Sequence, residues 1–353
     1  MSNKFKIKNT FSLLILGCIA GLNGCSLKNS DNIAQAQDTP KIIASHSILC
    51  DLIETIAEDT VDLTCLIDGD RDPHTYSPTP SQLKEMEQAQ LILYGGYQLE
   101  PQIIKLIKAT ETSAPKIAVY EQVVAEPISS EHHEHSDEEH LGEEHSEAEH
   151  SDEEHSDEEH SEAESDKHTE STLEPDPHVW HNIENTVAMV ELIQPILLQL
   201  NPTAAEQYLQ NTATLTDRLW QLDAWIDEQI ATIPEGQRIL VTTHNSFNYY
   251  AQAYYLEDYK ALQGLSSATS PTASQVTKLA EEIEQTEVPT IFVESTKSDR
   301  VMNNVARAAN VKISPEKLYA DGLGTADSYI EMMTHNTCAI VNGLSGECKA
   351  FGE

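Results

Sequence analysis

The sequence contains few positive charges and no long apolar run. Its 353 residues include 21 Lys and Arg against 59 Asp and Glu, which gives a formal net charge of -38. Such a chain repels a phosphate backbone, and this excludes nucleic acid as an expected partner. No apolar run reaches the about 18 to 20 residues that a membrane-spanning helix needs, which argues against a multi-span membrane protein. With 39% hydrophobic residues, the chain is long enough for about two domains with cores of their own.

Two common zinc motifs are also missing. None of the six cysteines stands in a Cys-x-x-Cys arrangement, so a site made of zinc thiolates is not expected. The sequence has no His-Glu-x-x-His segment, the helical motif of many zinc hydrolases.

Residues 1–24 are predicted to be an export signal. Three lysines near the start precede an apolar stretch, and Leu22-Asn-Gly-Cys25 ends it in a pattern that resembles a bacterial lipobox. In that interpretation Cys25 is acylated and holds the mature chain at a membrane surface, with residues 25–39 as a flexible tether. The alternative is a plain secretory signal in which Cys25 has no role.

Four cysteines remain once Cys18 and Cys25 are set aside. An even number in an exported, oxidising environment predicts disulfides. Three pairings are possible, and proximity along the chain favours Cys338 with Cys348 and Cys50 with Cys65.

Predicted strands and helices alternate from residue 41 onward. The first half gives strands at 41–45, 61–67, 91–94 and 116–119, separated by helices at 48–57, 81–88 and 100–108. This alternation predicts βαβ units with a mostly parallel sheet. We therefore expect an N-terminal α/β lobe over residues 40–201.

An acidic, histidine-rich tract is expected to interrupt this lobe at about residues 121–172. Between residues 131 and 166, eighteen side chains are acidic, and almost none is apolar. Such a composition cannot bury a core and predicts disorder. Flexible imidazoles favour several weak metal sites, whereas the alternative is a solvated charge run that aids solubility. The histidines of the tract are His132, His133, His135, His140, His145, His150, His155, His160 and His168.

Two helices open the second half. One is predicted at residues 182–200, and the other at 202–233, where it would be some 45 Å long at about 1.5 Å per residue. Because it is longer than a small lobe, we expect it to join two lobes. In residues 234–353 strands at 238–242 and 290–293 alternate with helices at 247–255, 272–285, 299–309 and about 325–342. This predicts a C-terminal α/β lobe.

Four segments place metal-binding types of side chain at junctions between these elements. They are Asp72-Pro-His74-Thr-Tyr-Ser-Pro-Thr-Pro80, Asp176-Pro-His178-Val-Trp-His181, Val241-Thr-Thr-His244-Asn-Ser-Phe247 and Tyr319-Ala-Asp321-Gly-Leu-Gly324. In open α/β sheets ligands collect beyond the carboxyl ends of the strands, and His244 directly follows such a strand. Proline fixes the backbone before His74 and His178, so each ring projects from a stiff loop. Any one of these histidines alone is more typical of a solvated or capping residue than of a ligand, and only the combination favours a site.

With these motifs, the chain resembles the zinc- and manganese-type solute-binding lipoproteins of bacterial metal ABC transporters (cluster A-I) over nearly its whole mature length. The resemblance implies two (β/α) lobes joined by a long interlobe helix, with a metal site in the cleft. It implies that His74 and His178 from the first lobe and His244 and Asp321 from the second bind one ion. It further implies a monomer of the periplasm or cell surface that delivers the ion to a membrane permease and its ATPase.

This ligand set favours Zn(II) over the alternative, Mn(II). Three imidazoles and one carboxylate suit a tetrahedral, borderline-soft ion. Family members that look manganese- or iron-selective carry Glu where His244 stands in this chain. Close to the expected ligands, His181 is the alternative to His178, and His46 is a candidate to line the cleft. Glu294 is a candidate to hold a ligand imidazole through its second nitrogen.

Two other classes of function are weighed against metal transport. A zinc hydrolase needs an open coordination position, whereas four protein ligands would close the site. A surface adhesin is the second alternative, because the same family fold is sometimes said to serve that role. We therefore expect a binding protein and not an enzyme.

Overall fold

The strands of the first half form one parallel sheet. The computed structural model describes residues 39–131 and 173–352. The sheet has the order β2-β1-β3-β4 and consists of β1 (Lys41–His46), β2 (Asp62–Ile67), β3 (Leu91–Tyr94) and β4 (Lys116–Ala118). In its centre Ile42 pairs with both Leu63 and Leu91. This is the α/β arrangement with a parallel sheet that the alternation predicted.

Helices cover both faces of this sheet. Successive side chains of a strand point to opposite faces, so Ile42 and Ile43 enter different apolar clusters. The cluster of Ile42 contains side chains from α1 (Ser47–Ala57) and α5 (Ile183–Leu200). The cluster of Ile43 contains side chains from α2 (Pro80–Gln88) and α3 (Pro101–Ala109). Burial on both faces explains the nearly continuous apolar run of β1.

The second half contains its own parallel strands. β7 (Ile239–His244) pairs with β8 (Asp258–Gln263), and β9 (Thr290–Ile291) pairs with β10 (Lys312–Ile313). A hydrogen bond of 2.9 Å from the Phe292 amide to the Val241 carbonyl joins the two pairs. A separate apolar cluster packs these strands against α8 (Ala273–Glu284) and α9 (Asp299–Ala308). The short α7 (Asn248–Ala253) follows β7.

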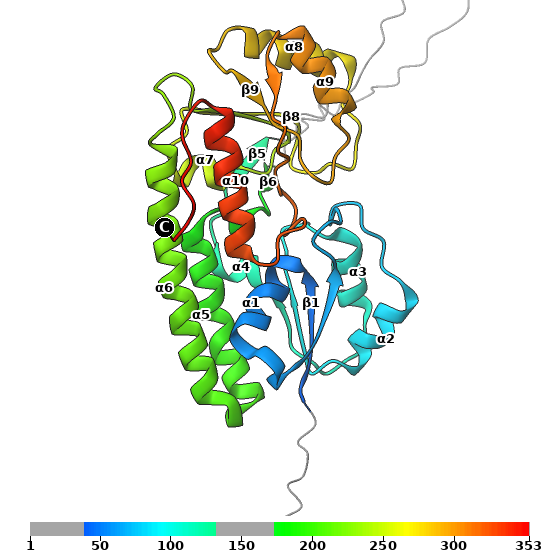
Figure 1. Ribbon diagram of the computed structural model, residues 1–353. Helices are drawn as coiled ribbons and strands as arrows, with labels where there is room; N and C mark the ends of the chain where they lie inside the picture. Colours follow the sequence, from blue (N-terminus) through cyan, green and yellow to red (C-terminus); the bar gives the residue numbers. More distant parts are fainter. Residues whose placement is uncertain (1–38, 132–172, 353) are drawn as a thin grey trace, which may run out of the picture. The chain divides into compact units, whose positions relative to one another are not determined.

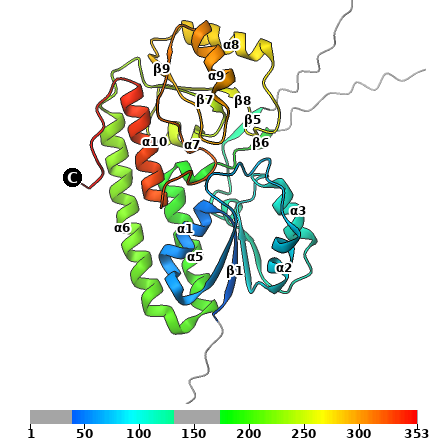
Figure 2. The same cartoon turned by 45° about the vertical axis from the view of Figure 1, so that its right-hand side comes forward.

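A long helix, α6 (Ala205–Ile230), contacts both halves. It packs against α1 and α5 from the first half and against α10 (Tyr329–Gly343) from the second, and Figures 1 and 2 show it running alongside α5 and α10. It is shorter than the helix expected at 202–233. Pro202 begins a separate 3-10 turn, Pro202–Ala204, and Pro234 has no amide hydrogen to donate to the carbonyl of Ile230. The 26 residues of α6 span about 39 Å at 1.5 Å per residue.

The histidine-rich tract begins later than its composition suggested. The expectation of disorder from residue 121 is wrong at this end, because α4 (Val119–Val123) and β5 (Ser129–Glu131) occupy the first ten or so positions. β5 pairs in antiparallel fashion with β6 (Leu173–Pro175), and Glu131 lies opposite Leu173. Both elements are too short to give a periodic pattern. The histidines of the tract lie outside the described residues.

The structure also contains strands that the sequence pattern did not reveal. Among the described strands β8 pairs with β7 alone, and it is mostly half-buried, so its residues lack the apolar run of a central strand. β10 has only two residues. Within the described ranges, no helix is long and apolar enough to cross a membrane.

Both expected disulfides are present. Cys50 of α1 is bonded to Cys65 of β2, and Cys338 of α10 is bonded to Cys348 in the segment after it. The described residues form one compact unit. The lobe boundaries at residues 201 and 234 stay a prediction. The expected signal, Cys25 and nearly all of the expected tether precede the described residues.

Candidate metal centre

Four side chains converge from separate segments of the chain. His74, His178, His244 and Asp321 each offer one ligand atom, and these atoms all lie within 4.8 Å of one another. His74 lies in the loop after β2, His178 precedes the 3-10 turn Val179–His181, and His244 is the last residue of β7. Asp321 follows the segment in which Leu318 bridges to Glu294. His74 and His244 thus mark the carboxyl ends of parallel strands, where ligands of α/β folds collect.

The distances between the ligand atoms suit a single ion. His74 Nε2 is 3.3 Å from His178 Nε2. Asp321 Oδ1 is 3.5 Å from Nε2 of both His74 and His178 and 3.1 Å from Nε2 of His244. Atoms bound at about 2.0 to 2.1 Å to a tetrahedral ion lie roughly 3.3 Å apart. The measured separations are close to this value.

Two of these atoms have no hydrogen-bond partner although they are buried. They are Nε2 of His244 and Oδ1 of Asp321, which face each other at 3.1 Å without hydrogen-bond geometry. Their side chains are fully buried. A buried polar atom without a partner destabilises a fold, and a bound cation would accept the lone pairs of both. The four residues therefore fit a metal ion.

Carboxylates orient two of the imidazoles. Asp176 Oδ1 accepts hydrogen bonds from His178 Nδ1 at 2.8 Å and from the His178 amide at 2.9 Å. Glu294 holds His244 in the same manner, with Oε1 accepting from the amide at 2.9 Å and Oε2 in a short contact with Nδ1. In both residues Nε2 is left for the ion. Such carboxylate partners fix the tautomer and raise the basicity of a ligand imidazole.

In the absence of a metal ion, these contacts determine the pKa values of the imidazoles. Burial lowers the pKa of His74 from its ordinary 6.5. Burial acts in the same direction on His178, but the hydrogen bond to Asp176 and the nearby carboxylate of Asp321 outweigh it and raise its pKa. For His244 the charges of Glu294 and Asp321 overcome burial and raise the pKa to about 10. In turn, His244 and the other imidazoles overcome burial and hold the pKa of Asp321 well below its usual range.

His46 and His181 lie close to the cluster without joining it. His46 is buried, forms a short hydrogen bond with the Tyr120 hydroxyl and packs against the Trp180 ring. His181 Nε2 is 2.9 Å from the Ala320 carbonyl, and its ring stacks on Phe247. Burial lowers the pKa of each to about 3, so both are neutral at ordinary pH.

Sequence reasoning missed three charged residues around the cluster. The sequence pattern places Asp176 in a stiff loop without indicating its contact with the His178 ring, and the repeated Asp-Pro-His tripeptide was the signal that could have revealed it.

Asp72 accepts the His74 amide hydrogen at 3.0 Å through Oδ1, while its Oδ2 is 2.6 Å from Ser267 Oγ. Lys297 Nζ lies 2.5 Å from Asp72 Oδ2 and 3.1 Å from Asp321 Oδ2. No spacing pattern in the sequence points to Lys297.

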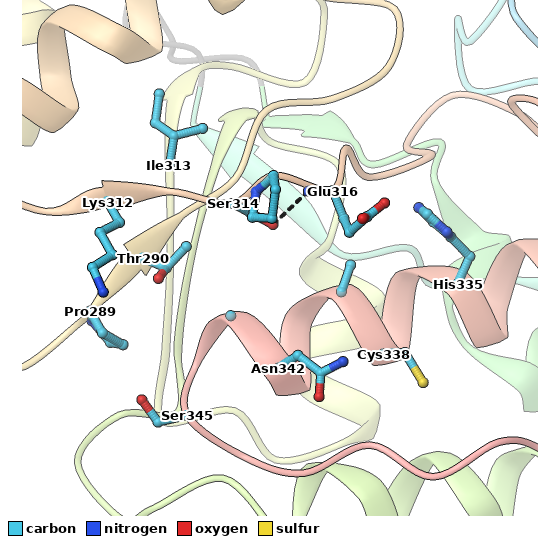
Figure 3. A pocket seen from close by; sticks show the side chains of 13 residues that line it. Pro289, Thr290, Lys312, Ile313, Ser314, Glu316, His335, Cys338, Asn342 and Ser345 are labelled. Carbon is cyan, nitrogen blue, oxygen red and sulfur yellow. Dashed lines mark hydrogen bonds between the residues drawn. The ribbon is translucent and has the colours of Figure 1, made fainter.

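A cavity lies apart from the cluster. It measures about 580 Å³ and is bounded by β9, β10 and α10, with Lys312, Glu316 and His335 among its lining residues (Figure 3). None of the four converging side chains lines it. His335 is turned to the Lys317 carbonyl, 2.8 Å from Nε2, and stacks on Tyr319. We therefore expect a structural role for His335.

The chain matches one protein family over most of its length. The sequence model of the family described as zinc-uptake complex component A, periplasmic, matches residues 42–343.

Two similar proteins are known as manganese-binding or manganese-transporting lipoproteins. The manganese-binding lipoprotein MntA of Halalkalibacterium halodurans is 27% identical over 344 residues, which cover 96% of this chain and 99% of the relative. The manganese ABC transporter substrate-binding lipoprotein PsaA of Streptococcus pneumoniae is 28% identical over 343 residues, which cover 95% and 96%.

A solved structure shares the fold. The periplasmic zinc-binding protein TroA from Treponema pallidum is 26% identical and superposes with a TM-score of 0.71, covering 87% of this chain and 99% of TroA. The α/β arrangement of parallel strands described above is thus that of a known type of metal-binding protein.

Proposed function

The chain belongs to the family of periplasmic zinc-uptake complex component A, and from this premise we propose that it captures Zn(II) outside the cytoplasm for import. In this proposal the ion is the substrate, and no reaction takes place on the protein. The captured ion passes to a membrane permease that is driven by an ATPase. The names of the similar proteins, which describe binding lipoproteins and transporter components, support this role.

One observation carries the proposal, namely the convergence of four buried ligand atoms within 4.8 Å. His74, His178 and His244 would supply nitrogen and Asp321 oxygen. Because two of these atoms have no other partner, a bound cation satisfies groups that the fold leaves unpaired. Four protein ligands also leave no evident position for a reactive water, as expected of a site that binds and does not catalyse.

Zinc is the metal that the donor set favours. Three imidazoles and one carboxylate match the tetrahedral nitrogen-rich sites of Zn(II). Mn(II) prefers harder, oxygen-rich surroundings, and Zn(II) exceeds Mn(II) in affinity at most sites of this kind.

Manganese is the second candidate, because two similar proteins carry it in their names. Both are 27 to 28% identical to this chain over nearly its whole length. A protein that meets more manganese than zinc can carry Mn(II) in a site that prefers Zn(II). The choice therefore depends on relative affinity, which can be measured directly.

Substitution of His244 tests the site and the metal together. His244→Glu exchanges an imidazole for a carboxylate, so the ratio of zinc to manganese affinity should fall, even if zinc still binds more tightly. His244→Ala should lower the affinity for both ions by more than about 100-fold, because loss of a residue that merely supports a ligand already costs up to that factor.

Competition titrations against a chelator of known affinity measure both effects, with His335→Ala as the matched control. His335 is preferable to His181 as a control, because His181 contacts the residue next to Asp321. An unchanged ratio in His244→Glu, together with unchanged zinc affinity in His244→Ala, would remove His244 from the site.

We also propose that the protein is anchored outside the cytoplasm by an acylated Cys25. The Leu22-Asn-Gly-Cys25 segment supports this proposal, and the two manganese relatives are named lipoproteins. Cys25→Ser should move the protein from the membrane fraction to the soluble extracytoplasmic fraction. If the variant still sediments with membranes after a salt wash, the lipid anchor is wrong.

A further inference from the structure

A buried cation lies beside the proposed cation site. The Lys297 side chain is only 9% exposed, and its Nζ contacts Oδ2 of Asp321 at 3.1 Å and Oδ2 of Asp72 at 2.5 Å. A positive charge at this distance repels a captured divalent ion. By its charge alone, Lys297 therefore lowers the affinity of the site for a divalent ion, so its presence calls for another explanation.

The two oxygens of Asp321 have separate surroundings. Oδ2 accepts hydrogen bonds from Lys297 Nζ and from Thr296 Oγ1, each at 3.1 Å. Oδ1 faces the three imidazoles at 3.1 to 3.5 Å and has no hydrogen-bond partner. One oxygen is thus held by the protein, and only the other is open to an ion.

We propose that Lys297 is a positioning residue that determines metal specificity, because it holds Asp321 as a one-oxygen ligand. This inference rests on the proposed function. With Oδ2 engaged, the four residues supply four donor atoms, the number that tetrahedral Zn(II) takes. If Oδ2 were free, Asp321 would offer both oxygens and the donor set would become larger and harder, which suits Mn(II) better.

A purely structural role for Lys297 predicts a different result. As a bridge between Asp72 and Asp321, it would keep two loops in place. Its loss would then lower the affinity for both ions by the same factor. Loss of its charge would also strengthen the attraction for both ions alike, since each carries two positive charges. Both effects cancel in the ratio of zinc to manganese affinity, so this ratio isolates the effect on Asp321.

The test compares Lys297→Met with Lys317→Met in the full chain. Lys297→Met keeps the length of the side chain and removes its charge and hydrogen bonds. Lys317 lies nearby and pairs with Asp299 at 2.6 Å, so Lys317→Met removes a similar charge without a contact to Asp321. Zinc and manganese affinities are measured by competition titration at the tight site, and Co(II) bound at one equivalent reports coordination number through its visible absorption.

In Lys297→Met the ratio of zinc to manganese affinity should fall about 10-fold, within the range of supporting residues around metal ligands. Its Co(II) absorption should weaken per ion, because five- and six-coordinate Co(II) absorbs less strongly than four-coordinate Co(II). Lys317→Met should match the unmodified protein in both measurements. Lys297→Arg keeps the positive charge and the hydrogen-bond donors. Its ratio of zinc to manganese affinity should therefore lie between that of Lys297→Met and that of the unmodified protein.

An unchanged ratio and an unchanged Co(II) spectrum in Lys297→Met would overturn the inference while leaving the proposed function intact. Absence of any tight zinc or manganese site in the unmodified protein would overturn both. If Lys297→Met does not fold, as judged by circular dichroism, Thr296→Val replaces it. That variant removes the second hydrogen bond to Oδ2 and should shift the ratio in the same direction by a smaller factor, and no shift in it would also overturn the inference.

Discussion

The two Asp-Pro-His loops have the same tripeptide and are held in different ways. In each, the Asp accepts the amide hydrogen of the His two residues later, at 3.0 Å in the first loop and 2.9 Å in the second. Asp176 also accepts a hydrogen bond from the His178 ring. Asp72 directs its other oxygen away from its own histidine, to Ser267 and Lys297 of the second half.

This difference shows that sequence identity of a motif does not fix its role. In the second loop one carboxylate oxygen fixes both the backbone and the ring of His178, while the other oxygen of Asp176 accepts a hydrogen bond of 2.8 Å from Asn248. The first loop depends for its position on Ser267 and Lys297, which lie 195 and 225 positions after Asp72 in the chain. We therefore expect Asp176 to orient the ring of His178 directly, and Asp72 to place His74 only through the backbone of its loop.

Neutralising each Asp should separate the two roles most clearly. Asp176→Asn removes the charge that orients the His178 ring and should lower zinc affinity by about 100-fold. Asp72→Asn disturbs the placement of His74 indirectly and should lower it by about 10-fold. Chelator competition at fixed pH measures both. Equal losses, or a larger loss in Asp72→Asn, would mean that the two loops are held equivalently.

Proton binding by the two rings offers a second comparison in the metal-free protein. Burial lowers the pKa of His74, whereas Asp176 and Asp321 outweigh burial and raise that of His178. As the pH rises, His74 should therefore lose its proton below 6.5 and His178 above it. At neutral pH a metal must displace the proton of His244, whose pKa is about 10, so zinc affinity should fall as the pH is lowered.

NMR titration of the ring resonances in the presence of chelator measures both values. In Asp176→Asn the pKa of His178 should fall towards that of His74. Titration of the two rings in the opposite order would contradict the assigned contacts.

Excision of the histidine-rich tract should have the smallest effect on the tight site. Only the second loop adjoins the tract, because β6 leads directly to Asp176. Joining residues 131 and 173 through a short Asn-Gly turn keeps the β5 to β6 pairing and should leave zinc affinity at the tight site unchanged. Calorimetry should show loss of the weaker binding equivalents alone. Disappearance of the tight site would show that the tract contributes to it.

The converging side chains could be predicted because the motifs that contain them resemble the ligand-bearing motifs of a known family. His74 and His178 follow prolines, and His244 ends a strand that its apolar run reveals. The residues that hold these ligands could not be predicted equally well. Lys297 reaches Asp72 across 225 positions in sequence, and such a contact depends on how two loops pack.

The fold was predictable wherever burial leaves a periodic pattern. β1 has five consecutive buried residues and was found with nearly correct limits. β8 has one buried residue in six and was missed, since an edge strand has a single neighbour and needs no apolar run. The onset of the tract was misplaced because α4 packs against α5 and β5 pairs with β6, both distant in sequence. Between α4 and β5, the Ile128 amide also donates a hydrogen bond of 3.1 Å to the Tyr249 hydroxyl.

Because β5 and β6 pair in antiparallel fashion, the fold tolerates changes in the length of the segment that connects them. The two strands lie about 4.8 Å apart, so whatever connects them begins and ends at nearly the same place. Closing a flexible connection costs only about 0.6 kcal/mol more for each doubling of its length. A foreign domain with adjacent termini could therefore replace the native insert. Because β6 continues into the loop of His178, a fluorescent domain inserted there would be joined directly to a ligand, in a position to report metal capture.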